Sequence, residues 1–225
     1  MRYAKPEAYS CSVEELCALS QKKNLELIRQ IVNKETAKDR KIIFFGWSMG
    51  GPQALVLAAD VFPEKTAAVL GYAATGPLNY YRPRLREKLG SLDLKSPYFI
   101  PRPTIDLISD SPLFPKKYKE KYIREYLIPM SPLMVAIQRK LQEVKDKWSI
   151  LTVQNPRNIP PLFLINGSRD QHGTRKGKAL AKWAGKFQKD VTLKYARGFC
   201  HLGMLCRGNE KLVDWYLNWL TERGL

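Results

Sequence analysis

Long apolar runs, acidic residues and histidines are all scarce in this chain of 225 residues. No apolar stretch approaches the roughly 18 residues of a membrane-spanning helix, and the opening residues lack the apolar core of a secretory signal. The four cysteines form no Cys-x-x-Cys pair and are too few for a disulfide framework, so we expect reduced thiols at Cys11, Cys17, Cys200 and Cys206. These absences predict a soluble, cytoplasmic protein with no membrane span.

The shortage of acidic residues gives the chain a net charge of +17, from 38 Lys and Arg against 21 Asp and Glu. The excess lies in the second half: residues 79–150 hold 15 basic and 8 acidic residues, and residues 166–211 hold 11 and 3. A positive field of this size attracts anionic partners but says nothing about fold. An anionic substrate or an acidic carrier protein is therefore a candidate partner, beside the simpler interpretation that the charge serves solubility.

The remaining composition is that of an ordinary globular domain, with 44% hydrophobic and 26% charged residues. Short β-branched or aromatic runs predict strands at 41–45, 66–72, 160–165 and 191–195. Capping signals and helical spacing predict helices at 13–33, with a possible break near 22–24, and at 54–59, 176–187 and 210–220. Strands that alternate with helices predict an α/β fold with a parallel sheet covered on both faces.

The second and third predicted strands are separated by more than eighty residues. This segment is too long for a simple connection, because loops beyond about 15 residues are usually functional. We therefore predict that residues 79–155 form a helical cap inserted into a core made of residues 1–78 and 156–225.

The run Gly46-Trp47-Ser48-Met49-Gly50-Gly51 matches the pattern Gly-x-Ser-x-Gly directly after a predicted strand and before a helix rich in small residues. Glycines at Gly46 and Gly50 allow a sharp turn, which would project the Ser48 hydroxyl at the carboxyl edge of the sheet. There the amide of Met49 could stabilise an oxyanion. A tight strand-to-helix turn without chemistry is the alternative.

A serine hydroxyl needs a base and an orienting acid, and candidates follow in the order acid, then histidine. Asp170 comes just after the third strand, and His201 lies between the fourth strand and the last helix. His172 is the rival base, because the chain has only two histidines. Asp170 could instead be a turn residue that caps the next segment.

The elbow GWSMGG, the acid segment NGSRD and the histidine segment GFCHLG together resemble the α/β-hydrolase superfamily over residues 7–225. The resemblance implies that Ser48 attacks an acyl carbonyl, that His201 takes and returns the proton, and that Asp170 orients the imidazole. It further implies a capped serine hydrolase of esters, lactones or thioesters that acts on a small acyl substrate, with Trp47 in contact with it. No cofactor and no metal are implied.

The chain departs from that family before the nucleophile, where only 47 residues precede Ser48. The first strands of the fold and the loop that gives a second oxyanion donor are expected to be absent. The strand at 42–45 would then present an unpaired apolar edge, which favours self-association. A catalytically impaired fragment, or a binding protein for an acidic partner, is therefore the alternative function.

Two other patterns are weaker. The segment 116–126 interleaves basic residues with tyrosines, as nucleic-acid binders do, but tyrosines at every fourth position favour a helical packing stripe and disfavour nucleic acid. A metal site could be assembled from His172, Cys200, His201 and Cys206, but their spacing matches no structural zinc pattern.

Overall fold

The computed structural model describes residues 12–37, 39–77, 95–97, 99–100, 102–115, 117, 119–120, 151–171 and 173–225. Its helices are α1 (Val13–Cys17), α2 (Gln21–Glu35), α3 (Gly50–Val56), α4 (Arg102–Ile108), α7 (Gly173–Ala184) and α8 (Glu210–Thr221). Its strands are β1 (Ile42–Trp47), β2 (Thr66–Tyr72), β3 (Leu162–Gly167) and β4 (Val191–Ala196). A π-helical turn, Leu57–Val61, extends α3, and 3-10 turns lie at Pro156–Asn158 and Gly203–Leu205.

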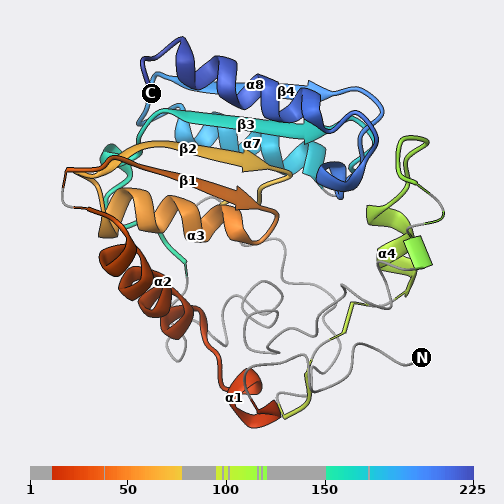
Figure 1. Cartoon of the computed structure of the whole chain (residues 1–225), viewed down its shortest axis with the longest axis horizontal. Helices are drawn as coiled ribbons and strands as arrows, with labels where there is room; N and C mark the ends of the chain where they lie inside the picture. The colour runs from red at the N-terminus through yellow and green to blue at the C-terminus, as the bar shows by residue number, and fades with distance from the viewer. Residues whose placement is uncertain are drawn as a thin grey trace.

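The four strands form one parallel sheet in the order β1-β2-β3-β4, as the alternation of strands and helices predicted. The pairs Trp47 with Tyr72 and Asn166 with Tyr195 lie near the carboxyl ends of their strands. Because all strands point the same way, the loops that follow them meet at one edge of the sheet (Figure 1). Ser48, Asp170 and His201 all come from these loops.

One face of the sheet is covered by α3 and α7. Small and aliphatic side chains of the two helices, such as Leu55 and Leu180, pack in one cluster with Val69, Leu162 and Leu164 of the strands. Successive side chains of a strand point to opposite faces of the sheet. Because both faces are covered, β2 and β3 are almost continuously apolar. This burial fixes the position of α3 directly after the elbow.

The other face is covered by α8, which lies on the opposite side of the sheet from α3 and α7 (Figure 1). Tyr216 and Trp219 pack against Phe163 with ring centroids 5.3 Å away in both cases. The Tyr216 hydroxyl also donates to the carbonyl of Gly71 at 2.9 Å. These contacts fix the last helix, and with it the end of the loop that carries His201.

Within the described residues, β1 pairs with β2 alone and is an edge strand. Its side chains on the α8 face remain exposed: Ile43 by 39%, Phe45 by 46% and Trp47 by 40%. Among the strands that the structure describes, the outermost one on this side of the sheet is therefore apolar.

The N-terminal helical region is divided earlier than predicted. Ser12 and Glu15 form the predicted capping box of α1, with reciprocal hydrogen bonds of 3.1 and 2.7 Å. The break lies at residues 18–20 rather than 22–24, because the Ser20 hydroxyl accepts from the amide of Lys23 at 3.1 Å and caps α2. The predicted cap stays a prediction, since residues 78–94 and 121–150 lie outside the described part; α4 belongs to that segment.

Candidate active site

Ser48 occupies a strained backbone position at the turn between β1 and α3. Its φ is +50°, a left-handed conformation that is rare for a residue other than glycine. The surrounding backbone holds it there: the Ser48 amide donates to the Tyr72 carbonyl at 3.1 Å, and the Ser48 carbonyl accepts from the amides of Gly51 and Thr75 at 3.1 and 2.9 Å. Met49 follows as the N-cap of α3.

The glycines of the elbow do not have equal roles. A Cβ on Gly46 would lie 2.7 Å from the Cα of Gly51, and a Cβ on Gly51 would lie 2.7 Å from the Cβ of Ala74. A Cβ on Gly50 would meet nothing within 4 Å. Close approach of the backbone therefore requires glycine at Gly46 and at Gly51, whereas space does not require it at Gly50.

His201 lies between Ser48 and Asp170. Its Nε2 is 2.9 Å from the Ser48 Oγ, and its Nδ1 is 3.0 Å from the Asp170 Oδ2. In the tautomer with its proton on Nδ1, the imidazole donates to Asp170 and accepts from Ser48. His201 is 8% and Asp170 2% exposed, so the acid is shielded from water. The rival base His172 lies outside the described residues.

Asp170 is also the end of a turn, because its amide donates to the Gly167 carbonyl at 3.1 Å. Asp170 thus has both roles: its backbone amide closes the turn, and its side chain contacts His201. Nearby, burial lowers the pKa of Lys176, and the Asp170 charge opposes that shift. The acid thus sits close enough to a cation at the start of α7 to affect its titration.

The main chain around His201 is held by two aromatic side chains. The Tyr72 hydroxyl donates to the Cys200 carbonyl at 2.6 Å, and the Trp47 indole N–H donates to the His201 carbonyl at 3.0 Å. Burial raises the pKa of Tyr72, which keeps the hydroxyl protonated. Sequence reasoning missed both contacts; the only signal was an aromatic residue at the carboxyl end of each strand. The predicted contact of Trp47 with substrate stays a prediction.

A third set of contacts comes from the segment that follows β2. The amide of Leu202 donates to the Ile108 carbonyl at 3.2 Å, and the amide of Arg207 donates to the Leu113 carbonyl at 2.9 Å. The Ser111 hydroxyl donates to the Gly198 carbonyl at 2.6 Å. The end of α4 and the turn after it are therefore bound to both sides of the histidine loop, residues 198–207.

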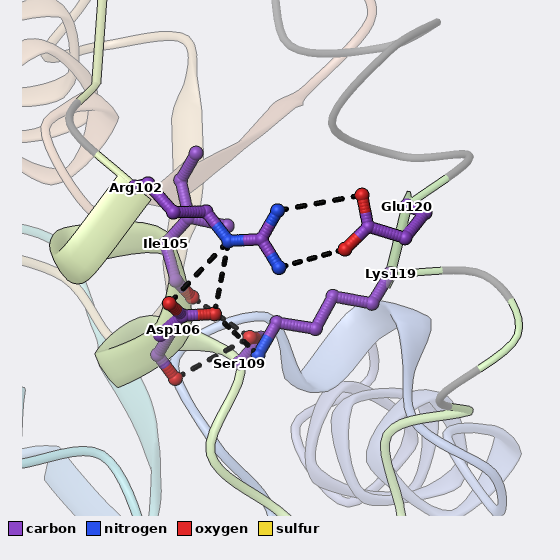
Figure 2. A network of polar contacts seen from close by, with 6 residues as sticks. All are labelled: Arg102, Ile105, Asp106, Ser109, Lys119 and Glu120. Carbon is purple, nitrogen blue, oxygen red and sulfur yellow. Dashed lines mark hydrogen bonds and ion pairs between the residues drawn. The ribbon is translucent and has the colours of Figure 1, made fainter.

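The solvent side of α4 carries a network of charges (Figure 2). The Arg102 guanidinium donates to Glu120 at 2.7 and 3.3 Å and to Asp106 at 3.2 and 3.3 Å, and the Lys119 ammonium lies 2.7 Å from Asp106. Lys119 and, to a smaller extent, Arg102 hold the pKa of Asp106 below its usual range. The network joins residues 119–120 to α4, which in turn contacts the histidine loop.

The thiols and the imidazole, which their spacing disfavoured as metal ligands, face different partners. His201 faces Ser48 and Asp170, whereas Cys200 and Cys206 face each other. The part of the chain that the structure describes holds no group of three His, Cys, Asp or Glu side chains arranged for a metal ion. Nor does any helix in that part have the length and apolar character to cross a membrane.

No family model and no curated protein sequence matches this chain. Solved structures do. A mutant polyneuridine aldehyde esterase has a TM-score of 0.61 and 14% identity, over 93% of this chain and 82% of that one. A monoacylglycerol lipase from Paleococcus ferrophilus has a TM-score of 0.60 and 18% identity, over 91% and 76%. MenH from S. aureus has a TM-score of 0.56 and 18% identity, over 89% and 75%.

These likenesses, together with the parallel sheet, show that the chain has the α/β-hydrolase fold. The fold class predicted from the elbow, acid and histidine segments is thereby confirmed.

Proposed function

We propose that this chain is a serine hydrolase that cleaves a carboxylic ester, lactone or thioester with Ser48 as nucleophile. One observation carries the proposal: a continuous chain of polar contacts, of 2.9 and 3.0 Å, links the Ser48 hydroxyl through His201 to the buried Asp170. The positive φ of Ser48 supports it, because strained backbone clusters at functional sites. The esterase and lipase among the similar structures agree with it.

In the proposed reaction, the Ser48 oxygen attacks the acyl carbonyl carbon while its proton passes to Nε2 of His201. Asp170 stabilises the imidazolium that results, and the Met49 amide donates to the oxyanion of the tetrahedral intermediate. The intermediate collapses to an acyl-serine, and the leaving alkoxide or thiolate takes the proton from His201. Water then attacks the acyl carbon, gives a proton to His201, and releases the acid as Ser48 regains its proton.

Labelling with a fluorophosphonate tests the nucleophile directly. We expect the folded wild-type protein to react and the Ser48→Ala variant not to react. His201→Ala should lower labelling and the hydrolysis of short p-nitrophenyl esters by about 10⁴-fold or more, whereas His172→Ala, the matched control, should keep most of both. Equal losses in the two histidine variants would refute the assignment of the base.

Absence of labelling in a folded wild-type protein would refute the hydrolase itself. The remaining candidate would then be a catalytically impaired protein of the same fold that acts by binding.

We also propose that an acidic carrier protein delivers the acyl group by docking along α7. Arg175, Lys178 and Lys182 are spaced by three and four residues and exposed on one side of this helix, and the exposed Lys186 and Lys189 follow its end in the sequence. No acidic residue occurs between positions 170 and 190. Because α7 begins three residues after the Asp170 turn, the row starts at the sheet edge that holds the site (Figure 1).

The double variant Lys178→Glu/Lys182→Glu tests this docking site. We expect the KM for an acyl group carried on an acidic protein to rise about 10-fold, because each exposed pair contributes up to about 1 kcal/mol. The KM for a small neutral ester should not change. Lys34→Glu on α2, with a side chain 83% exposed, is the matched control. An equal KM effect of the control, or no dependence of KM on salt, would contradict the proposal.

A further inference from the structure

Two thiols lie within the histidine loop and face each other inside the protein. Cys200 precedes His201 directly, and Cys206 follows the 3-10 turn Gly203–Leu205. Their Sγ atoms are 3.7 Å apart, and the two residues are 0% and 3% exposed. The proposed hydrolytic mechanism uses neither thiol.

The geometry of this pair suits a disulfide. An S–S bond is about 2.05 Å long, so the two sulfurs need to approach by only about 1.6 Å. The other polar contacts of the Cys206 sulfur are long and therefore weak. It lies 3.9 Å from the Leu202 carbonyl and 4.0 Å from the Ser111 hydroxyl. Neither contact is strong enough to hold the sulfur away from its partner.

The two thiols are not equivalent in acidity. The hydrogen bond with the Cys200 sulfur lowers the pKa of Cys206, while the same contact and burial raise the pKa of Cys200. Cys206 is therefore the thiol that reaches the reactive thiolate form first. Cys200 stays protonated and lies within reach as a resolving thiol.

We propose that Cys200 and Cys206 are a peroxide-reactive dithiol whose oxidation to a disulfide slows the site built around His201. The Cys206 thiolate attacks one oxygen of hydrogen peroxide, the O–O bond breaks, and hydroxide leaves and is protonated to water, so that Cys206 becomes a sulfenic acid. The Cys200 sulfur then attacks the Cys206 sulfur, the S–O bond breaks, and the Cys200 proton leaves with the hydroxyl as a second water. The dithiol loses two electrons and peroxide gains them.

The disulfide would act on the site through the main chain of Cys200. That main chain is fixed by the 2.6 Å bond from Tyr72 and continues into His201, whose Nε2 is 2.9 Å from the Ser48 hydroxyl. Drawing the Cys200 sulfur toward Cys206 pulls on this segment, and a displacement of about 1 Å at a catalytic group can cost up to about 100-fold in rate. This consequence rests on the proposed hydrolase function; formation of the disulfide does not.

A peptide map measures disulfide formation independently of activity. Cleavage after Arg197 and Arg207 places both cysteines in one peptide, residues 198–207. The protein is treated with hydrogen peroxide, the peroxide is quenched, and the protein is denatured in the presence of iodoacetamide, which alkylates free thiols. We expect the peptide to be unalkylated and two hydrogens lighter than the same peptide with two free thiols. Dithiothreitol should restore two alkylatable thiols. Oxidation of Met204 in the same peptide adds an oxygen and is thereby distinguished.

Three variants complete the test. Cys200→Ser and Cys206→Ser should abolish the mass loss, whereas Cys17→Ser, which removes a buried thiol elsewhere, should leave it intact. If peroxide produces only sulfinic acid at Cys206 or sulfoxide at Met204, the dithiol assignment is wrong.

The effect on the site is then measured by ester hydrolysis. In the wild-type protein, kcat should fall about 10-fold or more on oxidation and recover with dithiothreitol. Cys206→Ser should keep its kcat under the same treatment, and an equal reversible loss in this variant would overturn the coupling to His201. If the protein hydrolyses no ester before oxidation, the peptide map still decides whether the disulfide forms, so the two proposals fail separately.

Discussion

Replacing Tyr72 by phenylalanine should affect both stability and catalysis, because this hydroxyl is buried and supports the loop that carries His201. Tyr72→Phe keeps the ring and removes the 2.6 Å hydrogen bond to the Cys200 carbonyl. Leaving that buried carbonyl without its donor costs about 1–3 kcal/mol of the free energy of unfolding. For a chain of 225 residues, each kcal/mol lowers Tm by about 2–4 °C, so we expect a decrease of about 2–12 °C.

Tyr216→Phe is the matched control. Its buried hydroxyl also donates to a backbone carbonyl, but that carbonyl belongs to Gly71 of β2, at 2.9 Å, and not to the histidine loop. The two variants should therefore lose similar amounts of Tm. Only Tyr72→Phe should lower kcat for ester hydrolysis, by about 10–100-fold with little change in KM, because the loss acts through the position of His201.

Calorimetry gives Tm, and hydrolysis of a p-nitrophenyl ester well below both transitions gives kcat. If kcat is unchanged in Tyr72→Phe, or falls equally in both variants, the hydroxyl does not position His201. The contact would then be one more buried hydrogen bond of the core.

Three further predictions concern other parts of the molecule. Arg223 donates to Asp190 through two bonds of 2.7 Å and holds the pKa of this carboxyl below its usual range, so the stabilisation is present at neutral pH and is lost as pH falls through the folded pKa. In urea unfolding at pH 7, the free energy of unfolding of Asp190→Asn should be lower than that of the wild type by up to about 1 kcal/mol. The two proteins should be equally stable once the wild-type carboxyl is protonated, and a difference that persists in acid would contradict the prediction. Ile43→Lys should shift the protein from self-associated species toward monomer, because lysine on an edge strand opposes pairing with a strand of another chain. Size-exclusion chromatography with light scattering measures this shift, and a monomeric wild-type protein would contradict the prediction. Gly46→Ala should lower the free energy of unfolding by about 1–3 kcal/mol through backbone overlap, whereas Gly50→Ala should be tolerated, and equal effects in denaturant unfolding would show that the elbow relaxes.

The chemistry-bearing residues could be predicted because each has a local signal. Ser48, Asp170 and His201 all follow a short apolar strand, and the carboxyl ends of parallel strands share one edge. The strand ends themselves were harder to place. β1 and β3 run two residues beyond their predicted ends, to Trp47 and Gly167, because pairing with neighbouring strands continues through Gly46 and Gly167, whereas glycine in the sequence indicates the end of a strand.

The contacts that hold the histidine loop could not be predicted from the sequence. Tyr72 and Cys200 are 128 residues apart, and Trp47 and His201 are 154 apart. In the sequence, Tyr72 looks like the last buried position of its strand and Trp47 like an elbow residue that contacts substrate, because a hydroxyl or an indole N–H leaves no periodic pattern. The partner is a backbone carbonyl, which every residue has. Nothing in the sequence therefore marks either side chain as a donor to the histidine loop.

The histidine loop needs such donors for a physical reason. His201 lies beyond the end of β4, where no ladder of strand hydrogen bonds fixes the backbone, yet its imidazole must meet Ser48 and Asp170 at hydrogen-bond distance simultaneously. A loop held only by those two contacts would lose them together whenever it moved. Donors from β1, from β2 and from the segment after α4 fix the backbone on several sides, so the position of the base depends on elements that are far apart in the sequence.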